Sequence, residues 1–331
     1  MDDELERLAR GYRAFAEVEA AEVSPLYASL AIAVAEDEQL LRFLDGLPVG
    51  KRQPNLLFAA VQYLHGTPDG AETFRRWVAE DAHRVRATML ARATQTNEPA
   101  RCTALLPLLD AVPGPLALIE VGAAAGLCLY PDRYSYDYDG MRVGPPSPVH
   151  LSCSVTGEGP LPAGLPDVRA RLGVDLNPLD ISDADVRAWL RALVWPGPPA
   201  AERLARLDAA ARIAGLDPPR ILAGDLVERL PDVLDLVPQD CTPVVFHTAV
   251  LIYLPRARRQ EFAELVRSLP VRWIAQEAPG AVRDVAGARP PGEDANGRFL
   301  LSMDGVPLAW TAPHGGRIDW LPETAAATTA G

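Results

Sequence analysis

The residues best suited to chemistry lie in the stretch LALIEVGAAAGL, at 116–127. A short apolar run ends there at Glu120, and Gly122 and Gly126 frame three alanines that keep the backbone bare. A ligand can lie close to such a backbone, so the pattern is typical of a nucleotide-binding loop after a first strand. The alternative is a glycine pair that only packs a helix on a strand. We take Glu120, Gly122, Ala123 and Gly126 as candidate cofactor-binding residues.

The spacing of this loop discriminates between cofactors. The dinucleotide fingerprint GxGxxG is not met, because three alanines separate Gly122 from Gly126 and a pyrophosphate needs a glycine between them for close approach. S-adenosyl-L-methionine carries no phosphate, and the carboxylate of Glu120 suits its ammonium group. We therefore expect S-adenosyl-L-methionine as the cofactor and no metal.

Acidic residues also end two later apolar runs. In DRYSYDYDG, Asp137 or Asp139 is expected to close the next strand and to accept both ribose hydroxyls, unless it is a turn aspartate before Gly140. In RILAGDL, Asp225 is expected to reach an adenine amino group while Leu226 packs on the ring. A helix N-cap is the alternative for Asp225.

A histidine follows the run TPVVF at the rim where open sheets bind ligands. This residue, His247, is a candidate catalytic base, and with Thr248 it is also a candidate neighbour of the methionine carboxylate. A capping or structural role is the alternative. If His247 is the base, a change to Asn should lower turnover and leave cofactor affinity nearly unchanged.

The elements that must position these residues fall into two domains. Residues 1–113 predict an all-helical lobe, because apolar residues recur at helical spacing and no strand-like alternation interrupts them. Residues 114–331 predict a Rossmann-like, doubly wound, mostly parallel sheet, with a cap inserted at about 140–217. Asp304-Gly305 lies between two apolar runs and predicts an antiparallel C-terminal hairpin.

Composition excludes several classes of protein. The 331 residues are 48% hydrophobic and carry a net charge of −12, which argues against disorder and against a nucleic-acid partner. Four cysteines show no zinc spacing, and the acidic start MDDELERLAR is not a signal peptide. We expect a cytoplasmic protein with no membrane partner; the oligomeric state is open, a homodimer included.

Several blocks resemble one bacterial family across most of the chain. They are TNEPARC (96–102), LALIEVGAAAGLCLYPDRYSYDYDG (116–140), GVDLNPLDI (173–181), WLRALVWP (189–196), GDLVERLP (224–231) and VVFHTAVLIYL (244–254). The family is domain of unknown function 2332, which itself resembles class I S-adenosylmethionine-dependent methyltransferases in its sheet and glycine loop. Ala124 stands where that wider class commonly has glycine.

The family blocks also direct attention to polar residues outside the predicted sheet. Asn97 and Arg101, beside Glu98, precede the first strand and are expected to fold over the cofactor pocket. Asp175 and Asn177 are expected to face the acceptor and to take part in catalysis, unless they cap the following helix.

These observations favour methyl transfer from S-adenosyl-L-methionine to an unidentified small molecule. One alternative is a non-catalytic cofactor-binding or interaction module. Another is an enzyme that uses the same cofactor for non-methyl transfer or elimination. Product analysis separates the enzymatic alternatives, since methylation yields S-adenosylhomocysteine.

Overall fold

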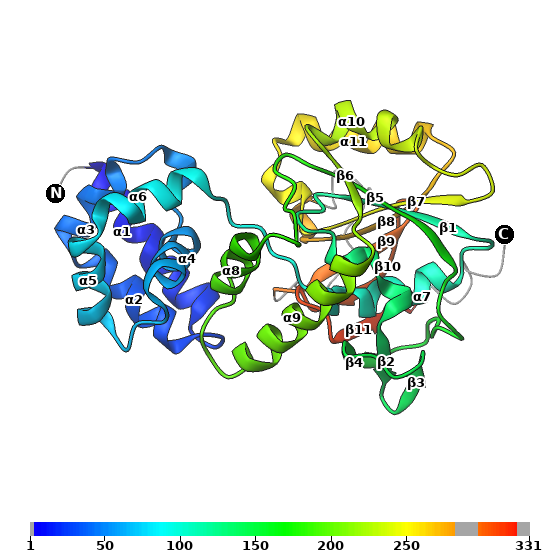
Figure 1. Ribbon diagram of the computed structural model, residues 1–331, viewed down its shortest axis with the longest axis horizontal. Coiled ribbons are helices and arrows are strands. Elements are labelled where there is room, and N and C mark those ends of the chain that lie inside the picture. The colour runs from blue at the N-terminus through cyan, green and yellow to red at the C-terminus, as the bar shows by residue number, and fades with distance from the viewer. Residues whose placement is uncertain (1–2, 282–296, 323–331) are drawn as a thin grey trace. The chain divides into compact units, whose positions relative to one another are not determined.

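A computed structural model describes residues 3–281 and 297–322 and divides the chain into two units (Figure 1). The helical unit comprises Met1–Thr96 and Ser182–Leu207, and the sheet unit comprises Asn97–Ile181 and Asp208–Gly331. This division differs from the expected boundary at 113. Of the expected cap at 140–217, residues 182–207 group with the helical unit and the rest with the sheet unit.

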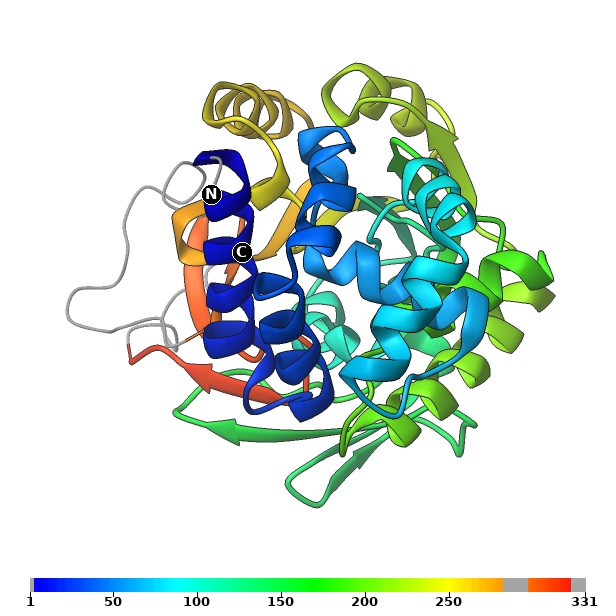
Figure 2. The same ribbon diagram turned by 90° about the vertical axis from the view of Figure 1, so that its left-hand side faces the viewer.

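The helical unit is built from short helices whose starts follow ordinary capping chemistry. Ser24 accepts a hydrogen bond from the amide of Tyr27, and Pro25 occupies the first helical position. Asp37 caps the next helix through the amides of Gln39 and Leu40. The helices are α1 (Asp3–Ala14), α2 (Pro25–Ala35), α3 (Glu38–Asp45), α4 (Pro54–His65), α5 (Ala71–Glu80), α6 (Ala82–Ala91) and α8 (Ala184–Ala192), with the π-helical turn η1 (Phe15–Ala20) and the 3-10 turn η2 (Val49–Lys51). Figure 2 shows the first six helices in blue and cyan.

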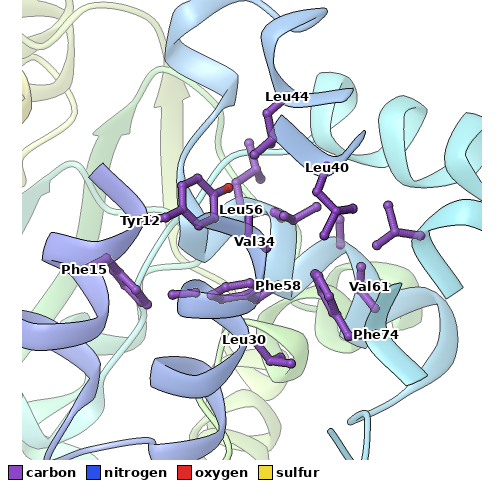
Figure 3. Packing of buried hydrophobic residues seen from close by; sticks show 14 of the residues in the cluster. Tyr12, Phe15, Leu30, Val34, Leu40, Leu44, Leu56, Phe58, Val61 and Phe74 are labelled. Atoms are coloured by element: carbon purple, nitrogen blue, oxygen red, sulfur yellow. The ribbon is translucent and has the colours of Figure 1, made fainter. Parts of the chain in front are cut away.

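An aromatic cluster around Phe58 forms the core of this unit (Figure 3). The ring of Phe58 lies 4.8 Å from that of Tyr27 and 5.6 Å from that of Phe74, measured between centroids. Phe15 and Tyr12 approach the same ring at 6.0 and 6.2 Å. The rings of Tyr12 and Phe74 meet Phe58 edge to face, which adds attraction to the burial of apolar area.

The sheet unit contains an eleven-stranded sheet among the described residues. Its spatial order is β3-β2-β4-β11-β10-β9-β8-β7-β1-β5-β6. The strands are β1 (Leu116–Val121), β2 (Ser135–Tyr138), β3 (Met141–Val143), β4 (His150–Thr156), β5 (Val168–Asp175), β6 (Arg220–Ala223), β7 (Thr242–Thr248), β8 (Arg272–Glu277), β9 (Phe299–Met303), β10 (Val306–Thr311) and β11 (Arg317–Trp320). The mostly parallel, Rossmann-like sheet that the sequence predicts is confirmed.

The parallel core of the sheet runs β6-β5-β1-β7-β8. Counted in chain order within this core, the strands read 3-2-1-4-5, the order of a doubly wound fold. The chain leaves β1 toward β5 on one side and later returns to β7 on the other. The topological switch point, where such sheets bind ligands, therefore lies between β1 and β7.

The chain after β1 does not form the helix that usually follows the first strand of a doubly wound fold. The 3-10 turns η4 (Leu127–Leu129) and η5 (Pro131–Arg133) follow instead, and the chain then forms β2, β3 and β4 at the far end of the sheet. The helix α7 (Cys102–Asp110) contacts β4 and β11 and is buried from residue 102 through residue 109. This burial explains why α7 belongs to the sheet unit although it precedes residue 113.

Helices α10 (Leu226–Leu234) and α11 (Arg256–Ser268) cover the other face of the parallel core. The helix α9 (Ala200–Leu216) precedes β6. The predicted hairpin is confirmed, since β9 and β10 pair in antiparallel fashion around Asp304 and Gly305. These two residues have φ angles of 52° and 82°, which suit a tight two-residue turn.

We predict that Phe58→Ala destabilises the helical unit by about 3–5 kcal/mol, because it removes a ring that four other rings contact. Urea unfolding of the intact chain, followed by circular dichroism, measures the loss. Val18→Ala is the control, because Val18 is 83% exposed and its removal should cost less than about 0.5 kcal/mol. A similar loss in both variants would show that the aromatic cluster is not the stabilising core.

Candidate functional site at the switch point

Two loops meet at the carboxyl ends of β1 and β7. Ala124 in the first loop and Ala249 in the second have φ angles of 48° and 57°. Residues with a side chain adopt this left-handed conformation at a cost, and such residues gather at functional sites. Because both lie at the switch point, this edge of the sheet is the candidate functional site.

The glycine loop is held by hydrogen bonds from both sides. The amide of Ala124 donates to Oδ2 of Asp175 at 2.8 Å, and the amide of Ala125 donates to Oδ1 of Asn97 at 3.0 Å. Asp175 ends β5, the strand beside β1, and its other oxygen accepts the amide of Asn177 at 2.7 Å. Asp175 and Asn97 therefore fix the loop. The Nδ2 of Asn97 is buried without a hydrogen-bond partner in the described part of the chain.

Glu120 is a buried carboxyl group at the end of β1. Its side chain is 5% exposed, and its Oε2 has no hydrogen-bond partner among the described residues. Burial raises the pKa of Glu120 well above its usual range, the nearby Cys128 raises it further, and the guanidinium of Arg101 opposes both. The carboxyl group is thus poised to ionise when a cation comes beside it.

Arg101 supplies the complementary charge from the 3-10 turn η3 (Pro99–Arg101), which Glu98 caps. Its Nη1 donates to the carbonyl oxygen and Oγ1 of Thr248 at 3.0 and 3.1 Å, and its Nε donates to the carbonyl oxygen of Pro313. Thr248 and Arg101, both predicted site residues, therefore lie together. Gln276 on β8 is in register with Thr248, and its Oε1 is buried without a partner in the described residues.

The Gly122 backbone is covered rather than open. A β-carbon on Gly122 would lie 2.8 Å from Cγ1 of Val250, and φ at Gly122 is 71°. A β-carbon on Gly126 would lie 2.9 Å from Pro219. Side chains of the protein therefore fill the space where a β-carbon would lie at each glycine, and the expectation that a ligand lies close to this backbone stays a prediction. Ala123 is likewise buried.

The prediction that Asp137 or Asp139 closes the strand beside β1 is wrong. Both residues belong to the β2–β3 hairpin at the far end of the sheet. Asp137 accepts the amide of Gly140 at 2.6 Å, and Asp139 accepts the amide of Val155 at 2.8 Å. They are turn residues, and Asp175 occupies the strand end that was assigned to them.

Asp225 and Leu226 act as structural residues of α10. Asp225 caps this helix through the amides of Val227 and Glu228 and also pairs with Arg258. Leu226 is 9% exposed and packs into the core beneath α10 and α11. The adenine-binding role expected for this pair is therefore replaced by the N-cap alternative.

The structure also corrects the assignment of His247 as a general base. Its side chain is fully buried on the α11 face of β7, opposite the face that carries Thr248. Trp273 Nε1 donates to its Nε2 at 3.0 Å, and its Nδ1 lies 2.7 Å from Oε1 of Glu277. Both ring nitrogens have hydrogen-bond partners inside the core, so His247 has no free nitrogen that could take a proton from a methyl-acceptor substrate.

The fold and this site define a doubly wound α/β protein with buried, partly unsatisfied polar side chains at its switch point. Residues 9–320 match the family model described as "Uncharacterized protein conserved in bacteria (DUF2332)", and the chain belongs to this family. No curated protein matches. Among solved structures, TrmN from Thermus thermophilus is 16% identical over 79% of this chain and 78% of that chain, with a TM-score of 0.24.

The described residues contain neither a cluster of metal ligands nor a membrane-spanning helix. Residues 3–281 and 297–322 hold no group of three or more His, Cys, Asp or Glu side chains that could bind a metal ion. The helices in those ranges are also too short or too polar to cross a membrane.

We predict that Glu120→Gln makes the folded protein more stable than wild type at pH 7, because the neutral carboxamide removes the cost of ionising a buried carboxyl group. The raised pKa of Glu120 means that the folded state binds a proton more tightly than the unfolded state. Wild-type stability is therefore lost as the pH rises from the unfolded pKa toward the folded pKa, and Gln removes this loss. Urea unfolding of both proteins at a series of pH values measures the difference.

The control for this experiment is Glu158→Gln, because Glu158 is exposed. Its stability should follow that of wild type at every pH. A Glu120→Gln protein with the same pH profile as wild type would show that Glu120 is ionised without cost in the folded protein.

Proposed function

We propose that this protein is an S-adenosyl-L-methionine-dependent methyltransferase that acts on a small molecule. The observation that carries the proposal is the buried Glu120 at the end of β1, with Oε2 unpartnered and the charge of Arg101 nearby. A buried carboxyl group and a buried guanidinium match the ammonium and carboxylate of an amino-acid moiety. The resemblance of the glycine loop to class I methyltransferases agrees with this choice.

The residues present fit the cofactor at three points. Glu120 would accept the ammonium group, and Arg101 would face the carboxylate. Asp175 ends the strand beside β1, the position from which an acidic residue reaches ribose hydroxyls in doubly wound folds. Asn97 has an unused buried donor beside the same loop.

The methyl group of the bound cofactor is already activated by its sulfonium, so the chain chiefly has to position the reactants. Asp175 and Asn97 hold the loop that would carry the donor. Glu120 would release its proton to solvent when the ammonium group binds. The carboxylate that results and the ammonium group would then neutralise each other in a core that can solvate neither charge. We assign His247 no part in proton transfer, because both of its ring nitrogens have partners inside the core. A cytoplasmic location and a small-molecule acceptor belong to this proposal.

We predict that wild type binds S-adenosylhomocysteine in calorimetry and that Glu120→Gln weakens binding at least about tenfold. Asp137→Asn is the matched control, because it changes a carboxyl group on the same sheet far from the switch point. Turnover with candidate acceptors should release S-adenosylhomocysteine. Release of methylthioadenosine would instead indicate non-methyl transfer or elimination. No binding of S-adenosylhomocysteine at millimolar concentration would contradict the proposal.

The same carboxyl group predicts a pH dependence of binding. Because burial raises the pKa of Glu120 in the free protein, binding of an ammonium group should release a proton. Wild-type affinity for S-adenosylhomocysteine should therefore rise as the pH rises toward the raised pKa of Glu120, whereas Glu120→Gln should lack this rise. Calorimetry in buffers of different ionisation enthalpy measures the released proton, and equal proton release by both proteins would contradict the role given to Glu120.

A further inference from the structure

A single carboxylate oxygen, Oε1 of Glu277, holds the loop after β7. The amides of Val250 and Leu251 donate to Oε1 of Glu277 at 2.8 and 3.0 Å. Ala249, just before them, is the left-handed residue of this loop, and its amide donates to the carbonyl oxygen of Gln276. Successive amides that converge from such a turn form a concavity for an anion, and here the anion is a side chain of the protein.

Glu277 is in turn oriented by a second buried side chain. His247 Nδ1 lies 2.7 Å from the same Oε1, and both side chains are 0% exposed. Because Trp273 Nε1 donates to Nε2 of His247, the proton of the neutral ring must sit on Nδ1 and point at Glu277. The carboxylate thus accepts three hydrogen bonds in a core lined by Phe262 and Leu251, where charge-assisted bonds are strong.

The loop that Glu277 holds is part of the candidate site. Val250 packs against Gly122, and Leu251 is fully buried below the loop. Glu277 thus lies on the α11 face of the sheet and holds the backbone of Val250, the residue whose side chain covers Gly122. Thr248, one residue before Ala249, anchors Arg101 on the opposite face.

We propose that Glu277, oriented by His247, is a positioning residue that fixes the 249–251 loop and so determines how Val250 and Thr248 shape the switch-point site. This inference deepens the proposed function and rests on it for the ligand readout. A residue that only stabilised the core would lower the melting temperature without changing the loop or the affinity for a ligand. A positioning residue changes all three.

The test is a graded series at position 277. Glu277→Leu removes the acceptor, so protection of the Val250 and Leu251 amides from hydrogen exchange should fall at least about tenfold. Its dissociation constant for S-adenosylhomocysteine should rise at least about tenfold. Glu277→Gln keeps a neutral acceptor and should give intermediate values of both, because amide bonds to a carboxylate are stronger than bonds to a carboxamide.

The control is Val266→Ala, which removes packing from the same core without touching a hydrogen bond of the loop. It should lower the melting temperature yet leave amide protection at 250 and 251 and ligand affinity as in wild type. Equal loss of affinity in Val266→Ala at a similar melting temperature would overturn the proposal.

Amide exchange and ligand affinity together separate a failure of the positioning role from a failure of the proposed function. If Glu277→Leu does not fold, Glu277→Gln decides, and wild-type values of both protection and affinity in that variant would overturn the proposal. If wild type itself binds no S-adenosylhomocysteine, the proposed function fails, while the exchange of the two amides still decides whether Glu277 positions the loop.

Discussion

A carboxyl group that cannot be solvated is the constraint around which the switch-point edge is arranged. Glu120 ends the central strand of the parallel core, where water is excluded and no hydrogen bond in the described chain reaches its Oε2. Arg101 does not offset the cost of burying Glu120 with its Nη1 or Nε, since Nη1 donates to Thr248 and Nε donates to Pro313. Buried polar groups that stay unsatisfied cost free energy, so Glu120 carries a cost that the described chain does not offset.

The sequence predicts the fold better than the site because strands and turns depend on local patterns. The apolar runs that end at Glu120, His247 and Glu277 all form parallel strands, and the turn residues Asp304 and Gly305 form the expected hairpin. Which strand lies beside which is a non-local property. The acidic residue beside the glycine loop is accordingly Asp175, although Asp137 is the nearer of the two to β1 in the sequence.

His247 and Glu277 show a second reason why strand ends mislead. Side chains alternate between the two faces of a strand, so a residue at the right edge still points to the crevice or to the opposite core. Thr248 and His247 are neighbours in sequence, yet one binds Arg101 and the other packs against Phe262. An apolar run such as VVF does not reveal which face will carry the helices, because a parallel strand is buried on both.

The pairing of β11 with β4 has a consequence for how the chain is made. Arg317 lies in register with Ser154, so the last described strand joins the first half of the sheet unit to the second. Strands β2, β3 and β4 leave the ribosome long before this partner exists, and until then the edge of β4 is unpaired. Contacts so distant in sequence form slowly, and exposed strand edges invite association with other chains. Synthesis itself thus leaves the β2–β4 end of the sheet unfinished until Arg317–Trp320 has emerged.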